Sequence, residues 1–124
     1  EKGIESQCHW LGYVKNIPLE YPKYDLVILP SIAEGTPNVV LEAFAYGMPV
    51  IASNIKMTAP LYEDKQLIFN LDDMQGVNKC LRYLDSMSGE DRVKMAKRNR
   101  CFVENNYSTE VMTNNYINTI LGVV

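Results

Sequence analysis

Two acidic residues that lie eight positions apart, Glu34 and Glu42, flank the stretch of this sequence that could do chemistry. Between them, turn-forming residues give way to apolar ones, which predicts a loop followed by a helix that Asn38 caps. The first N–H groups of a helix have no intrahelical partner and carry a partial positive charge, so a helix start can bind phosphate. Gly35 lets the backbone approach a ligand closely, and Pro37 lies where its missing N–H group costs little.

The two carboxylates indicate what would surround such a phosphate. A carboxylate repels a phosphate, but it accepts hydrogen bonds from sugar hydroxyl groups, each worth roughly 1.5–3 kcal/mol. Glu34 falls in the loop and Glu42 falls one turn into the helix, which favours a ligand with a central phosphate and a hydroxylated ring at each end. A nucleoside diphosphate sugar has this layout. Without the surrounding sequence, a surface loop residue and a solvated helix residue would be the commoner interpretation.

Strands of a parallel sheet must position this loop. Residues 26–29 are consecutive apolar residues stopped by Pro30, a pattern typical of a strand that is buried on both faces. The helix is expected to end at Gly47 because Pro49 forbids its continuation, and residues 50–52 predict a second buried strand. In open sheets of this kind, ligands bind at the carboxyl ends of the strands, where the loop is expected to lie.

Shorter segments complete the predicted fold. Residues 8–14 and 67–69 predict two more strands, and residues 18–24 predict one helical turn with a tyrosine-rich face. A strand, a helix, a strand and then further helices is the order typical of an open α/β sheet. We therefore expect an α/β domain with a Rossmann-like parallel sheet flanked by helices.

The last third of the chain is predicted to be helical. Asp72 with Gln75 three positions later resembles a capping box, and it accompanies apolar residues at helical spacing, Met74, Val77, Leu81 and Leu84. Ser88 and Ser108 are each expected to cap one further helix. The last helix is expected to carry an apolar set, Met112, Ile117, Ile120 and Leu121.

Composition argues against several classes of function. The 124 residues predict one domain with an ordinary hydrophobic content of 47%, and the net charge of −3 argues against nucleic-acid binding. Three widely spaced cysteines and a single histidine argue against a disulfide framework or a zinc site. The sequence contains no Asp-x-Asp, so metal dependence is not indicated, and no cofactor is expected. No apolar run reaches the ~20 residues that span a bilayer, and the chain opens without a signal-like region, so we expect a cytoplasmic location.

The stretch from Pro30 to Ser53 resembles the signature of the GT4-type glycosyltransferases, which have the GT-B fold. Their hallmark is a pair of glutamates separated by seven residues, and Glu34 and Glu42 match it. The flanks match as well, at Pro30-Ser31, Glu34-Gly35, Glu42-Ala43 and Gly47-Met48-Pro49-Val50-Ile51-Ala52. Residues 10–14 resemble the strand and glycine loop near the nucleotide base in this family. Its C-terminal helices are matched at Phe102, Tyr107-Ser108 and Tyr116.

The resemblance implies that residues 1–124 form the later part of a C-terminal, nucleotide-sugar-binding domain, with the N-terminal acceptor-binding domain outside this chain. It implies retaining transfer of a glycosyl group from a UDP- or GDP-linked donor to an acceptor hydroxyl, in the biosynthesis of a glycan or glycoconjugate. The missing domain would bind the acceptor, a glycan or a lipid-linked sugar. The chain alone would be inactive, because half of the cleft is absent.

Roles for individual residues follow from the same resemblance. Glu34 would act at the catalytic centre by binding hydroxyl groups of the transferred sugar, and Glu42 would bind the ribose hydroxyls. Val14 would present its backbone to the base. The sugar and the diphosphate would contact the backbone of a helix start made of Gly35, Thr36, Pro37, Asn38 and Val39. Many relatives have an aromatic residue and a glycine where this chain has Thr36-Pro37, which leaves the donor sugar open.

Two other functions are compatible with the sequence. A nucleotide-sugar 2-epimerase has a similar fold but needs no acceptor, and a non-catalytic module could bind a nucleotide or a protein partner on the same fold. The basic run at residues 91–100 could contact anionic lipid at the inner face of the membrane, although a solvated helix face is the favoured interpretation. If the first half of the domain is missing, the sheet edge that would face it is exposed. An exposed edge predicts self-association of the chain.

Overall fold

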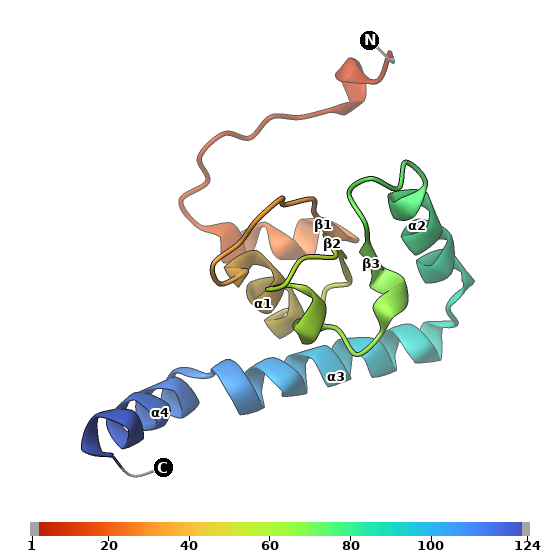
Figure 1. Ribbon diagram of the computed structural model, residues 1–124. Helices are drawn as coiled ribbons and strands as arrows, with labels where there is room; N and C mark the ends of the chain where they lie inside the picture. Colours follow the sequence, from red (N-terminus) through yellow and green to blue (C-terminus); the bar gives the residue numbers. More distant parts are fainter. Residues whose placement is uncertain (1–2, 123–124) are drawn as a thin grey trace.

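A three-stranded parallel sheet lies at the centre of the computed structural model, which describes residues 3–122 (Figure 1). The strands β1 (Val27–Leu29), β2 (Val50–Ser53) and β3 (Ile68–Phe69) lie side by side in the order of the sequence. Both pairings are parallel. This arrangement confirms the predicted parallel sheet, including its short third strand.

Helices flank the sheet on several sides (Figure 1). α1 (Asn38–Ala45) contacts β1 and β2, and α2 (Gly76–Ser86) contacts β3. α3 (Gly89–Tyr107) runs below the sheet in Figure 1 and packs against α1. α4 (Thr109–Leu121) continues away from the sheet, and none of its residues is buried. The predicted α/β, Rossmann-like class is therefore confirmed.

The two longer strands differ in burial. Every residue of β2 is buried, because this strand has a neighbour on each side. β1 pairs with β2 from Val27 opposite Val50 to Leu29 opposite Ala52, but its other edge pairs with no strand within residues 3–122. Ile28 of β1 is 43% exposed. The prediction that this strand is buried on both faces is wrong, because the described chain supplies nothing that covers Ile28.

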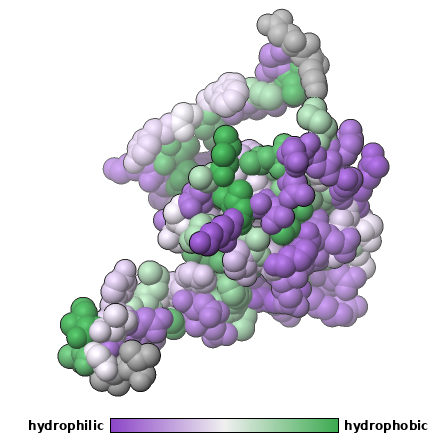
Figure 2. All heavy atoms as spheres, in the orientation of Figure 1, coloured by the Kyte–Doolittle hydropathy of each residue, from purple (hydrophilic) through white to green (hydrophobic). Residues whose placement is uncertain are grey.

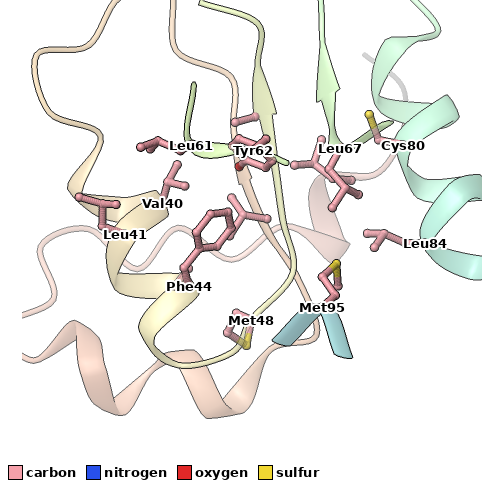
Figure 3. Packing of buried hydrophobic residues seen from close by; sticks show 14 of the residues in the cluster. Val40, Leu41, Phe44, Met48, Leu61, Tyr62, Leu67, Cys80, Leu84 and Met95 are labelled. Atoms are coloured by element: carbon pink, nitrogen blue, oxygen red, sulfur yellow. The ribbon is translucent and has the colours of Figure 1, made fainter. Parts of the chain in front are cut away.

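The core lies between the sheet, the helices α1, α2 and α3, and the loop that joins β2 to β3. This loop contains two 3-10 turns, η4 (Ala59–Leu61) and η5 (Lys65–Leu67). Val40 and Phe44 lie four positions apart on α1, so both point into the core (Figure 3). The ring of Phe44 meets that of Tyr62 edge-on, with 5.3 Å between the centroids. The core therefore fixes the side of α1 that is turned away from solvent.

The start of α1 differs from the prediction that Asn38 caps it. Pro37 occupies the capping position without a side-chain hydrogen bond, and Asn38 is the first helical residue. The Asn38 N–H group donates to the Thr36 carbonyl at 2.8 Å, so the chain turns before the helix begins. The predicted end is confirmed, because Gly47 adopts a φ of 71° and its N–H group donates to the Phe44 carbonyl.

The predicted capping box at Asp72 and Gln75 is wrong. Gln75 occupies the position before α2 without a side-chain cap, and Met74 precedes the helix and is 88% exposed. Asp73 organises the turn before the helix, because its carboxylate accepts hydrogen bonds from the Gln75 N–H group at 2.9 Å and from the Lys79 ammonium at 2.7 Å. The start of α2 therefore lacks the side-chain cap that the sequence pattern predicts.

The two predicted serine caps are confirmed. The Ser88 hydroxyl accepts a hydrogen bond from the Asp91 N–H group at 3.1 Å, and the Ser108 hydroxyl accepts one from Val111 at 3.3 Å. The apolar residues predicted on α4 are exposed, and Figure 2 shows hydrophobic side chains at the outer end of this helix. No helix within residues 3–122 is both long and apolar enough to span a bilayer.

Residues 8–14 form an extended arm and not the predicted strand (Figure 1). Trp10 in this arm is 95% exposed, and no strand within residues 3–122 pairs with the arm. A short 3-10 turn, η1 (Glu5–Gln7), precedes it. The single turn predicted at residues 18–24 consists of two 3-10 turns, η2 (Ile17–Leu19) and η3 (Tyr21–Lys23).

Tyr21 attaches η3 to α1. Its side chain is 6% exposed, and its ring stacks on that of Tyr46 with 5.3 Å between the centroids. The Tyr21 hydroxyl donates a hydrogen bond to the Glu42 carboxylate at 3.1 Å. Burial, together with the negative charge of Glu42, raises the pKa of Tyr21 from 10.0 to about 12.

We expect the protein to lose stability as the pH rises from about 10 to about 12. The unfolded chain releases the Tyr21 proton at its ordinary pKa of 10.0, whereas the folded chain holds it up to a pKa of about 12. The contribution is therefore complete below pH 10 and is lost through this interval. Urea denaturation over a pH series measures it. The Tyr21→Phe variant should lose less stability than the wild type between these pH values, and an equal loss would contradict the prediction.

Tyr62 provides a second test of the core. Its side chain is 4% exposed, and within residues 3–122 its hydroxyl is a buried polar atom without a hydrogen-bond partner. We expect Tyr62→Phe to raise the free energy of unfolding by about 1 kcal/mol, because it removes an unpaired polar group and keeps the contact with Phe44. Urea denaturation at pH 7 measures this. The matched control is Tyr83→Phe, which should destabilise because the Tyr83 hydroxyl donates to Asp64. A destabilised Tyr62→Phe protein would refute the expectation.

Candidate functional site

The loop of residues 30–37 leaves the carboxyl end of β1 and leads directly into α1. This edge of a parallel sheet is where ligands bind in open α/β folds. Glu34 lies half-buried in the loop, and Glu42 lies exposed on the second turn of α1. The structure therefore gives the two glutamates the settings that the sequence predicts, one in the loop and one in the helix.

Glu34 is held by a hydroxyl group within its own loop. The Ser31 hydroxyl donates a hydrogen bond to Glu34 Oε1 at 2.6 Å. The backbone of Ser31 is fixed in turn, because the fully buried Ser53 hydroxyl donates to the Ser31 carbonyl at 2.5 Å. This second bond joins the end of β2 to the loop that follows β1. The position of the Glu34 carboxylate is thus tied to the sheet.

The same connection continues into the core. The buried Thr58 hydroxyl, which follows β2, donates a hydrogen bond to the Ser53 carbonyl. Thr58, Ser53 and Ser31 therefore form a series of hydroxyl groups that leads from the interior to Glu34. Buried hydroxyl groups with satisfied hydrogen bonds make a local structure specific, because losing one partner leaves the other unpaired.

Glu42 lines a hollow of about 250 Å³ at the start of α1. Thr36 and Asn38 line the same hollow, so three of the predicted site residues come together there. The remaining walls come from α1, α3 and α4, through Leu41, Ala45, Val103, Tyr107 and Met112. A helix start and a carboxylate therefore face one concave surface that is otherwise mostly apolar, which is the general character of a small-molecule site.

Other predicted site residues do not line this hollow. Glu34, Gly35 and Val39 lie outside its lining, and Pro37 is buried at the junction of loop and helix. Val14 lies half-buried near the end of the extended arm. Of the predicted site residues, the hollow therefore gathers only Thr36, Asn38 and Glu42.

Positive charge is scarce at the hollow, because its lining within residues 3–122 includes no lysine or arginine. On α3, Lys94 pairs with Glu90 at 2.7 Å, and Arg98 lies 3.4 Å from Glu63. The Arg100 guanidinium donates to the Ala45 carbonyl at 3.0 Å, near the end of α1. Several cations of the basic run therefore already have protein partners.

A larger hollow of about 570 Å³ lies beside β3 and α2, and none of its lining residues belongs to the loop of residues 30–37 or to α1. Its cations are engaged: Lys79 pairs with Asp73 at 2.7 Å, and Lys65 donates to the carbonyls of Ala59 and Tyr62. The described residues also contain no cluster of His, Cys, Asp or Glu side chains that could hold a metal ion. Size alone does not make this hollow a binding site. The hollow of about 250 Å³ at α1 is the better candidate for a ligand site, because it contains predicted site residues.

Sequence reasoning missed the hydroxyl groups that hold the two carboxylates. Ser31 and Ser53 lie within the same motif as Glu34. The motif gives their positions in the sequence, but it does not predict their hydrogen bonds. Tyr21 lies 21 residues before Glu42, and the only signal was a tyrosine-rich turn. These contacts depend on how the strands bring distant segments together, which spacing alone does not reveal.

Comparison with known proteins identifies the family. Residues 1–86 match the family described as "Glycosyl transferases group 1". The Vi polysaccharide biosynthesis protein VipC/TviE of Salmonella typhi is 28% identical over 122 residues, which cover 95% of this chain and 21% of that protein. The UDP-Gal:alpha-D-GlcNAc-diphosphoundecaprenol alpha-1,3-galactosyltransferase of Escherichia coli is 30% identical over 88 residues, which cover 68% of this chain and 23% of that protein.

A third relative, the O-antigen chain mannosyltransferase B of Escherichia coli, is 30% identical over 81 residues, covering 63% of this chain and 21% of that protein. The chain spans about a fifth of the length of these three relatives. The family match covers well over half of the chain and includes both glutamates and the loop that joins β1 to α1. This chain therefore belongs to the group 1 glycosyltransferases.

Proposed function

We propose that this chain forms the donor-binding surface of a glycosyltransferase that transfers a glycosyl group, with retention, from a UDP- or GDP-linked sugar to an acceptor hydroxyl. The observation that carries the proposal is the hollow at the start of α1, where Thr36 and Asn38 lie beside Glu42. The helix start attracts phosphate, and the carboxylate accepts hydrogen bonds from ribose hydroxyls.

The other predicted site residues would contact the remaining parts of such a donor. Glu34, held by Ser31, accepts hydrogen bonds from hydroxyl groups of the transferred sugar at the catalytic centre. Gly35 and Val39 contribute backbone contacts near the sugar and the diphosphate, and the backbone of Val14 contacts the base. The arm that carries Val14 must then lie near α1 when the donor is bound.

Further domains complete the proposed enzyme. The chain spans about a fifth of the length of the relatives named above, which leaves room for an acceptor-binding domain and for the first half of the donor-binding domain. No lysine or arginine within residues 3–122 lines the hollow at α1. The charge of the diphosphate is therefore neutralised by residues of the absent half, in addition to the start of α1.

The names of the relatives favour transfer over epimerisation. Two of the three are named as transferases, one of them acting on GlcNAc-diphosphoundecaprenol and the other on O-antigen chains. We infer a surface polysaccharide pathway, an acceptor that is a lipid-linked sugar or a growing glycan, and a location at the cytoplasmic face of the membrane. No helix within residues 3–122 could span a bilayer, so we propose that any membrane association of this chain is peripheral. Lys94 and Arg98 of α3 already have acidic partners, which weakens the case for lipid contact through this helix.

The roles of the two glutamates are separable by calorimetry on the intact enzyme. We expect Glu42→Gln to weaken the binding of free UDP or GDP by about ten- to hundredfold, because a charged acceptor of ribose hydroxyls is lost. Glu34→Gln should weaken the binding of the nucleotide sugar far more than that of the free nucleotide, because only the sugar contacts Glu34.

Each variant replaces a carboxylate by an amide of the same shape. Comparing the affinity for the free nucleotide with that for the nucleotide sugar is the internal control. An unchanged affinity of Glu42→Gln for UDP and GDP would count against the proposed site. Product analysis with the donor alone separates transfer from epimerisation, because an epimerase converts its substrate without any acceptor.

We also expect the isolated chain to self-associate. The outer edge of β1 pairs with no strand within residues 3–122, and Ile28 beside it is exposed. Unpaired strand edges and uncovered apolar side chains favour contact between copies. Light scattering over a concentration series measures the mass. Ile28→Lys should reduce the association because charge on an edge strand opposes pairing, and a wild-type chain that is monomeric at high concentration would refute the prediction.

A further inference from the structure

The Glu42 carboxylate needs a fixed orientation if it is to accept hydrogen bonds from two adjacent hydroxyl groups of one ring. Glu42 lies exposed on α1, where a long side chain samples several rotamers. Ordering such a side chain at the moment of binding opposes affinity, whereas ordering it beforehand does not. A contact that holds Glu42 in the free protein therefore bears directly on donor binding.

Tyr21 provides such a contact from a segment outside the loop and α1. The Tyr21 hydroxyl donates to Glu42 Oε2 at 3.1 Å. The tyrosine ring cannot move freely, because it is buried and stacks on Tyr46 with an angle of 28° between the ring planes. A rigid side chain therefore presents a hydrogen-bond donor to a flexible one.

The chemistry of the donor suits a binding carboxylate. A phenol is neutral, so the carboxylate keeps its full charge, whereas a lysine or arginine would form an ion pair and compete with ligand hydroxyls. The phenol of Tyr21 is protonated throughout the neutral range, because its pKa, raised to about 12, lies far above it. The bond occupies Oε2, and an ionised carboxylate can accept several hydrogen bonds over its two oxygens, so Glu42 Oε1 stays available.

We propose that Tyr21 is a positioning residue for nucleotide binding: its hydroxyl holds Glu42 Oε2 and thereby directs Oε1 toward the two hydroxyl groups of the donor ribose. The inference rests on the proposed role of Glu42. It adds a residue of η3, before β1, that supports Glu42 from outside the lining of the hollow.

A double-mutant cycle on the intact enzyme tests the proposal, with the affinity for UDP or GDP measured by calorimetry. We expect Tyr21→Phe to weaken nucleotide binding about three- to tenfold, because the ring and its stacking stay while one hydrogen bond is lost. In the Glu42→Gln background, the same change should have little further effect, because Tyr21 acts only through the carboxylate. The matched control is Tyr46→Phe, which keeps the stacked ring and should leave affinity unchanged.

The possible outcomes separate the inference from the function on which it rests. If Glu42→Gln weakens binding and Tyr21→Phe does not, the role of Tyr21 is refuted while that of Glu42 stands. If the two effects add, Tyr21 acts on the fold and not through Glu42, and the inference also fails. If Glu42→Gln leaves affinity unchanged, the proposed function and the inference fail together.

A second measurement uses the Tyr21 side chain itself as the reporter and needs this chain alone. Carbon-13 NMR of labelled tyrosine side chains follows the titration of Tyr21, which the Tyr21→Phe spectrum assigns. Removing the negative charge with Glu42→Gln should lower the pKa of Tyr21 from about 12. Glu34→Gln is the matched control and should leave this pKa unchanged, because Glu34 bonds to Ser31. A Tyr21 pKa that is the same with and without the Glu42 charge would refute the contact.

Discussion

The hydrogen bond from the buried Ser53 hydroxyl to the Ser31 carbonyl is the interaction on which the arrangement of the site depends. Parallel pairing of β1 with β2 brings the ends of both strands to one edge, but it leaves the loop after β1 free to choose its path. The Ser53 bond removes that freedom at the first residue beyond Pro30. Ser31 can then hold Glu34, and the loop enters α1 in one defined direction.

Both glutamates accept a hydrogen bond from a neutral hydroxyl group. Most other acidic side chains with a side-chain partner pair with a lysine or arginine instead. Ser31 donates to Glu34 and Tyr21 donates to Glu42, whereas acidic residues such as Asp73 and Glu90 pair with lysines at the surface. A hydroxyl group orients a carboxylate without cancelling its charge. The two glutamates therefore keep the capacity to accept hydrogen bonds from a ligand, which an ion pair would reduce.

Local signals predicted the elements that local interactions decide. The apolar runs predict the three strands, and Gly47 predicts the end of α1. Ser88 and Ser108 predict the caps of α3 and α4. The composition of residues 8–14 predicts a strand, but a strand forms only beside a partner, and residues 3–122 provide none for this arm. The contacts of Tyr21 and Ser53 span more than 20 residues, so they follow from the completed sheet and not from sequence spacing.

The short length of α1 has a consequence for how sequence variation in this family should be interpreted. A helix of eight residues is not stable by itself in water, so its direction is set by the core beneath it. Val40 and Phe44 provide that support, although neither lines the hollow. If this chain binds its donor as proposed, exchanges at these interior positions are expected to tilt or shift the helix start and to alter ligand preference. Residues that do not line the hollow then belong among the determinants of selectivity.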